Sequence, residues 1–141
     1  MIVLLKRVLF FMIVISSGCV ANNSENSYQS FWEEFRVAVL ADDYRKLEKL
    51  TQFPLEVKGV DDSMPIVQYK KEQFQAVFQK IMAQPMKIPH EDTLIETTMR
   101  GVVDKTTTVS VEVGYDEQGV EQLVFQNVKG KWLLVRAYLD E

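Results

Sequence analysis

The sequence predicts a mixed α+β domain in which three N-terminal helices pack on a curved, mostly antiparallel sheet. Two observations support this fold class. Apolar residues recur at helical spacing in most of the chain before Pro85, whereas they alternate every second position in much of the chain after Pro89. Because helices that precede a run of strands gather on one side of the sheet, we expect one α+β domain.

The first 18 residues have the layout of an export signal. Lys6 and Arg7 precede an apolar run, and small residues follow at 16–18, as in a secretory signal peptide. A transmembrane helix would need roughly 20 predominantly apolar residues, and the two charges interrupt this stretch early. We therefore expect a signal peptide at 1–18, a polar tether at 19–27 and a single domain at 28–141.

Cys19, the only cysteine, follows the signal in the sequence Ser-Ser-Gly-Cys. This sequence resembles the lipobox of bacterial lipoproteins, in which the cysteine thiol receives a diacylglyceryl group, the chain is cut before it and the new amine is acylated. The resemblance implies lipidation at Cys19. Two or three acyl chains would then anchor the domain stably in the membrane. The alternative is a secreted protein whose cysteine lies near the cleavage site by chance.

Val20 suggests which membrane would hold the anchor. Lipoproteins retained at the inner membrane carry Asp at this position, so the resemblance implies an outer-membrane lipoprotein that faces the periplasm. The periplasmic face of the inner membrane and a soluble periplasmic or secreted form are the alternatives.

Composition argues against several partners. Loss of Lys6 and Arg7 with the signal changes the net charge from −4 to −6, and a negative domain without a basic run is a poor ligand for nucleic acid. With Cys19 used for lipid, no disulfide, thiolate nucleophile or cysteine-based metal site is available. No metal-ligand, nucleotide-binding or hydrolase motif occurs, so we expect no metal and no cofactor.

Three helices are predicted in the first part of the domain. Aromatic and apolar residues follow a helical stripe from about Ser27 to Leu40, and Asp42 or Asp43 can cap a second helix that begins near Tyr44. The third helix contains "FQAVFQKIM" and stops before Pro85.

Strands are predicted between and after these helices. "FPLEVKG" and a short piece at 66–69 precede the third helix, and "DTLIETTMRGVV", "TTTVSVEVGY", "VEQLVFQNV" and "WLLVRAYL" follow it, with "DEQG" and "KGK" as turns. The last four segments form a meander in this prediction.

Four segments resemble the nuclear transport factor 2-like superfamily and its cone-shaped, cystatin-like fold. They are "FWEEFRVAVLADD", "YRKLEKL" running into "FPLEVKG", "KEQFQAVFQKI" and the final "NVKGKWLLVRAYL". The resemblance implies a cone of strands around the helices. It also implies a choice of functions, because members of this superfamily include isomerase-like enzymes and non-catalytic binding domains.

Few residues are candidates for chemistry. Asp61, Asp62, Tyr69 and Tyr115 could line a pocket or its mouth, where a buried carboxylate would gain the raised pKa that acid/base catalysis needs. An aspartate pair after a strand is more often a solvated turn. The single histidine, His90, is expected in a surface loop, and we assign no catalytic residue.

The sequence therefore predicts a non-catalytic, lipid-anchored module that binds another protein at the cell envelope. Assembly, secretion and immunity to a toxin are all compatible roles. The alternative is a small-molecule-binding or isomerase-like enzyme that uses the cone as its pocket. If the protein is an enzyme, we expect an open apolar cavity. If it is a binding module, we expect a filled interior and an exposed hydrophobic patch.

Overall fold

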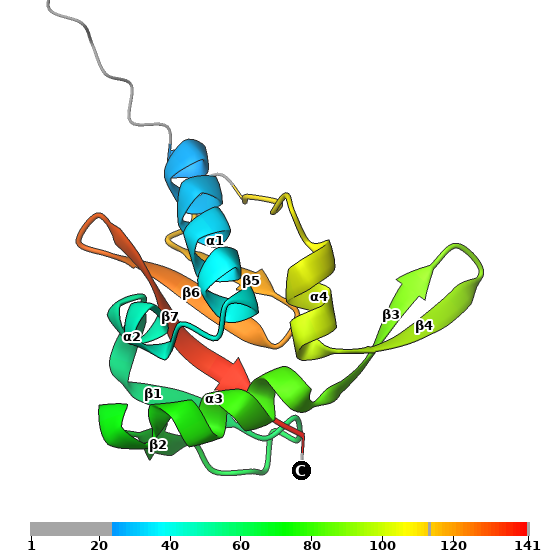
Figure 1. The fold of residues 1–141 in the computed structure, drawn as a ribbon, viewed down its shortest axis with the longest axis horizontal. Helices are drawn as coiled ribbons and strands as arrows, with labels where there is room; N and C mark the ends of the chain where they lie inside the picture. Colours follow the sequence, from blue (N-terminus) through cyan, green and yellow to red (C-terminus); the bar gives the residue numbers. More distant parts are fainter. Residues whose placement is uncertain (1–23, 113, 141) are drawn as a thin grey trace, which may run out of the picture.

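A computed structural model describes residues 24–112 and 114–140 and shows a mixed α+β fold with a mostly antiparallel sheet, as predicted (Figure 1). Its helices are α1 Ser24–Leu40, α2 Tyr44–Lys49, the 3-10 turn η1 Lys71–Gln73, α3 Phe74–Ala83 and α4 Met99–Lys105. Its strands are β1 Thr51–Lys58, β2 Val67–Tyr69, β3 Pro85–His90, β4 Thr93–Thr98, β5 Glu117–Val120, β6 Leu123–Val128 and β7 Lys131–Tyr138.

Five of the strands form one sheet in the order β2-β1-β7-β6-β5. β1 and β7 run parallel, and the other neighbouring pairs are antiparallel. The last strand of the chain therefore lies at the centre, and β2 and β5 are the two edges. On β6 and β7, Phe125 faces Leu134 and Leu123 faces Ala137, which places four buried residues on the inner face.

Helix α1 lies across the inner face of the sheet (Figure 1). It begins at Ser24, so it includes the last four residues of the predicted tether. It ends at Leu40 because Asp42 adopts a left-handed conformation with φ of 52°, and Asp43 N then donates to Ala38 O at 2.9 Å. Cys19 and the predicted signal lie outside the described residues.

The predicted cap of the second helix is confirmed. Asp43 Oδ1 accepts a hydrogen bond from Lys46 N at 3.1 Å, which satisfies one free donor of the first turn of α2. Pro85 ends the third helix as predicted, and it opens strand β3. The β3–β4 hairpin projects from the body of the molecule (Figure 1).

The prediction of a strand through residues 99–103 was wrong, because α4 occupies this segment. Thr98 caps the helix by accepting from Gly101 N at 3.1 Å. Met99, Val102 and Val103 are buried at helical spacing, which the Thr- and Val-rich composition of the segment concealed.

Two predictions between residues 106 and 120 were also wrong. The segment 106–112 forms no strand, although Val109 is buried and Val111 is half-buried, as its alternating pattern requires. The predicted turn at 116–119 belongs largely to β5, and the chain turns at Glu121 instead, where φ is 49°. The turn at Lys129 and Gly130 was predicted correctly.

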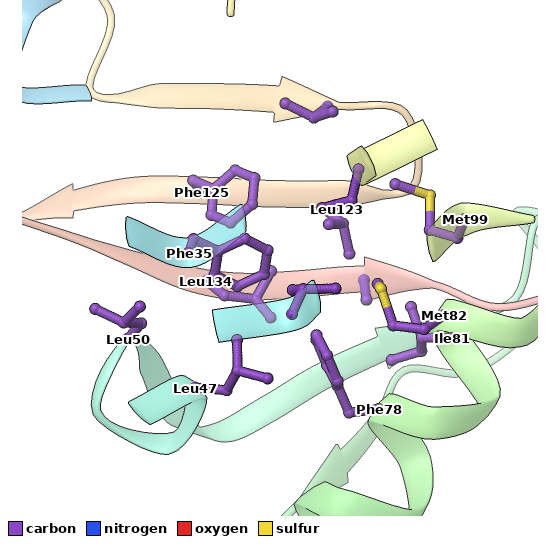
Figure 2. Close-up of a cluster of buried hydrophobic side chains, with 14 of the residues drawn as sticks. Phe35, Leu47, Leu50, Phe78, Ile81, Met82, Met99, Leu123, Phe125 and Leu134 are labelled. Atoms are coloured by element: carbon purple, nitrogen blue, oxygen red, sulfur yellow. The ribbon is translucent and has the colours of Figure 1, made fainter. Parts of the chain in front are cut away.

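One hydrophobic core joins α1, α2, α3 and α4 to the sheet. Figure 2 shows Phe35, Phe78 and Phe125 between the helices and the sheet, with Leu50 and Met99 at opposite sides. All five side chains are buried. Burial of apolar surface on this scale is the main stabilising contribution to the fold.

Candidate functional site

Aromatic rings fill the space between α1 and the sheet. The ring centroid of Phe35 lies 5.0 Å from that of Phe125 and 6.2 Å from that of Phe78. Trp32 packs edge-on against Phe125 at 5.9 Å, and its Nε1 donates to Thr106 O at 2.7 Å. These side chains occupy the volume in which a small-molecule pocket between helix and sheet would have to lie.

Tyr28 contributes a buried phenol to this interior. Its ring centroid lies 4.7 Å from that of Trp132, and among the described residues its hydroxyl has no hydrogen-bond partner. Burial raises the pKa of Tyr28 well above its ordinary value. The phenol therefore stays protonated at physiological pH, which makes it a poor general base.

Asp61 and Asp62 lie in the exposed turn that follows β1. Ser63 N donates to Asp61 Oδ1 at 2.9 Å, and this backbone hydrogen bond holds the pKa of the Asp61 carboxyl below its usual range. Asp62 is exposed and forms an ion pair with Lys58 at 3.2 Å. The pair shapes a solvated turn, and the depressed pKa of Asp61 is the opposite of what a general acid requires.

Tyr69 and Tyr115 lie at opposite edges of the sheet. Tyr69 is in β2, where it is half-buried and lines a cleft with Val57 and Leu139. Tyr115 precedes β5 and is 66% exposed. The structure therefore keeps Tyr115 apart from Tyr69 and from the Asp61–Asp62 turn, and these four residues do not line one pocket.

The other chemical candidates do not converge either. His90 is at the surface as predicted, but the prediction of a loop was wrong, because His90 is the last residue of β3 and pairs with Thr93 of β4. Its carbonyl oxygen accepts from Thr93 Oγ1 at 3.1 Å. Within residues 24–112 and 114–140, no group of three or more His, Cys, Asp or Glu side chains could hold a metal ion. Over the same residues, no helix has both the length and the apolar character needed to cross a membrane.

An apolar surface beside β2 is the feature that sequence reasoning missed. Seven large hydrophobic side chains are exposed in the described chain, and four of them lie between β1 and the end of β2. We call these four residues the β2-edge patch: Val60, Met64, Ile66 and Val67. A cleft of about 200 Å³ adjoins them and is lined by Pro65, Tyr69 and Leu139 among others.

Local geometry explains why this patch stays at the surface. Met64 N donates to Asp61 O at 3.0 Å, which closes a turn and brings Met64 over Gly59. The Met64 side chain lies against Gly59, where an added Cβ would require this side chain to shift. Val60 and Met64 lie between the two predicted strands, and Ile66 begins the predicted short strand at 66–69, so this apolar content was the available signal.

β2 also leaves one side of its backbone free. It pairs only with β1, through the partners Leu55–Tyr69 and Val57–Val67, and has no neighbour on its outer side among the described strands. An exposed strand edge with apolar side chains beside it is a surface that proteins use to pair with other chains.

A second concave surface lies where α1, α2, α3 and the start of α4 meet. It has a volume of about 540 Å³, a buried apolar floor that includes Phe78 and Met82, and Tyr44 and Gln79 at its rim. Arg100 at this rim is already engaged, because it donates to Val39 O and Leu40 O and pairs with Asp42 at 2.7 Å. Its evident role is to satisfy the C-terminal carbonyls of α1.

The comparisons with known proteins identify no relative. No family model, no curated protein and no solved structure matches this chain.

Proposed function

We propose that this protein is a non-catalytic module that binds another protein at the bacterial cell envelope. The single observation that carries the proposal is the β2-edge patch. Its four apolar side chains are each about half exposed, although burying such side chains is favourable. A partner protein that covers the patch would recover this free energy, as in many protein interfaces.

The proposed anchor is a lipid on Cys19, and the geometry of α1 supports its use as a tether point. The chain enters α1 at one end of the molecule, and the β1–β2 loop lies at the opposite end (Figure 1). The 17 residues of α1 span about 25 Å. A lipid attached shortly before α1 would leave the patch directed away from the membrane, and Val20 favours the outer membrane, facing the periplasm.

We also propose the finer description of the fold, a nuclear transport factor 2-like cone. The order of α1, α2, β1, β2 and α3, followed by the antiparallel strands β5 to β7, supports it. This fold description adds nothing to the choice between binding and catalysis, since one fold hosts many functions.

Small-molecule binding is the second candidate, and the surface around Arg100 favours it. Its volume of about 540 Å³ lies in the usual range for ligand sites, roughly 300–1,000 Å³. Its floor residues are already almost fully buried, so a ligand would gain little apolar contact there. This candidate therefore ranks below the protein-binding proposal.

Affinity capture of the full lipidated protein from crosslinked envelopes tests the proposed function. Strains carrying Cys19→Ala, Ile66→Ser and Leu94→Ser would be compared with the wild type. Ile66 and Leu94 are both exposed, at 50% and 63%, and Leu94 lies outside the patch on β4, so it is the matched control.

The proposal predicts one protein partner at near-stoichiometric yield from the wild type and from Leu94→Ser. Ile66→Ser should lose this partner, and Cys19→Ala should recover less of it. Recovery of lipid with no protein above background would contradict the proposal, and native mass spectrometry would then search for a small ligand.

A further inference from the structure

The second edge of the sheet, β5, also has free backbone groups. Val120 pairs with Leu123 across the turn at 121–122, and Asn127 N donates to Asp116 O at 2.7 Å. Because hydrogen-bonded positions alternate in an antiparallel pair, residues 116, 118 and 120 direct their N–H and C=O groups toward β6. The groups of Glu117 and Gly119 therefore point outward, and no described residue bonds to them.

Open space lies along this outward side. One cleft of about 270 Å³ and another of about 230 Å³ separate β5 from the extended segment 106–112, which we call the strap. Ser110 of the strap and Gly119 of β5 line both clefts, so the open space follows the strand edge. The absence of a side chain at Gly119 lets another backbone approach there.

Two glutamine side chains hold the strap in place. Gln118 Oε1 accepts from Glu112 N at 3.1 Å, and its Nε2 donates to Glu112 O at 3.0 Å. Gln29 on α1 acts in the same way, accepting from Val109 N at 3.0 Å and donating to Thr107 O at 3.0 Å. These bonds use strap groups that a neighbouring strand would need, so the strap does not close the β5 edge.

The edge is strongly acidic. Glu112, Glu117 and Glu121 line the two clefts, and no basic side chain lines either one. All three are exposed, and none forms an ion pair with another described residue. A cationic occupant would therefore meet unneutralised carboxylates on both sides of the free backbone edge.

We propose that the outer edge of β5 binds an extended segment of a partner protein, rich in Lys or Arg, by strand addition. The N–H and C=O groups of Glu117 and Gly119 pair with the backbone of this segment, and Glu112, Glu117 and Glu121 attract its cations. This inference goes beyond the proposed function, because it concerns the sheet edge opposite the β2-edge patch and a partner of different chemistry.

Binding of a synthetic peptide, followed together with amide hydrogen exchange in the protein, tests the proposal. The probe is a short peptide of alternating Lys and Val. Its controls are a Glu–Val peptide and a peptide with Pro in place of each Val, which keeps the positive charge but loses the N–H groups of one strand edge. Binding to the full chain in neutral detergent micelles would be followed by fluorescence anisotropy. Amide hydrogen exchange would be followed for residues 117–119.

Strand addition predicts that the Lys–Val peptide binds and slows exchange at Glu117 and Gly119, while the other two peptides do neither. Glu117→Lys should raise the Kd at least about tenfold, a change of about 1.4 kcal/mol. Glu91→Lys, an equal charge change at the exposed β3–β4 turn, should leave the Kd within about twofold.

Three results would overturn the proposal. They are equal binding of the proline peptide, binding without slower exchange at residues 117–119, and equal effects of Glu117→Lys and Glu91→Lys. The Ile66→Ser variant separates this test from the proposed function, because it changes one residue of the β2-edge patch and should leave peptide binding unchanged.

Discussion

The two edges of the sheet differ in chemistry although they share one core. β2 lies beside the exposed apolar residues Val60, Met64, Ile66 and Val67, whereas β5 lies beside Glu112, Glu117 and Glu121. Each edge strand has only one neighbour among the described strands. Both edges have free backbone N–H and C=O groups. The side chains beside each edge therefore determine which kind of segment could pair with it.

The interior explains why both edges can remain open. Phe35, Phe78 and Phe125 form a continuous buried layer under the central strands, so the stability of the domain does not depend on covering either edge. Apolar residues in this layer account for the fold. The proposed function gives the four exposed residues of the β2-edge patch a different role, which is contact with a partner protein.

Phe125→Ala should have the largest effect, because it acts on the layer that supports both edges. Loss of this fully buried ring should lower the free energy of unfolding by about 3–5 kcal/mol. Urea denaturation would measure this change, with Tyr115→Ala as the exposed aromatic control at about 0.5 kcal/mol or less. A loss below about 2 kcal/mol for Phe125→Ala would contradict the packed interior.

Gln118→Leu should have a smaller effect that is confined to the β5 edge. It removes three hydrogen bonds that hold Glu112 and Tyr115, so we expect a loss of about 1–2 kcal/mol. Amide exchange should become faster in the strap and remain unchanged in β2. Faster exchange at both edges would show that the strap is not an independent element.

Tyr28→Phe should change stability in the opposite direction. The hydroxyl is buried without a described partner, so its removal should stabilise the protein by up to about 1 kcal/mol and leave both edges unchanged. Thermal denaturation at one pH would detect the rise in Tm. A lower Tm would reveal a hydrogen bond to this phenol.

Ile66→Ser should have the smallest effect on stability. The side chain is half exposed, so the free energy of unfolding should change by less than about 0.5 kcal/mol. Partner capture should nevertheless fail, as described above. A large loss of stability would instead identify Ile66 as a structural residue, and the contrast between the two edges would then lose its functional meaning.

Helical spacing and alternation predicted most of the elements. The stripes of α1 and α3 and the alternation of β6 and β7 each place apolar residues on one face, and a single core absorbs all of them. The Asp43 cap and the turn at Lys129 and Gly130 were also predicted from the sequence, because each depends on residues that are adjacent in the chain.

Segments whose conformation depends on distant partners were not predictable. The strap has the composition of a strand, yet Gln29, distant in sequence, and Gln118 on β5 take up its backbone groups. The helix α4 was hidden because Thr98 can serve either as a strand residue or as an N-cap. The β2-edge patch escaped notice because exposure is a property of the folded chain.

The most direct measurement is photocrosslinking in living cells, with a photoreactive amino acid placed at position 66 in one strain and at position 94 in another. Binding through the β2-edge patch predicts one discrete protein adduct from position 66 and none from position 94. No adduct at position 66, or the same adduct at equal yield from both positions, would contradict it.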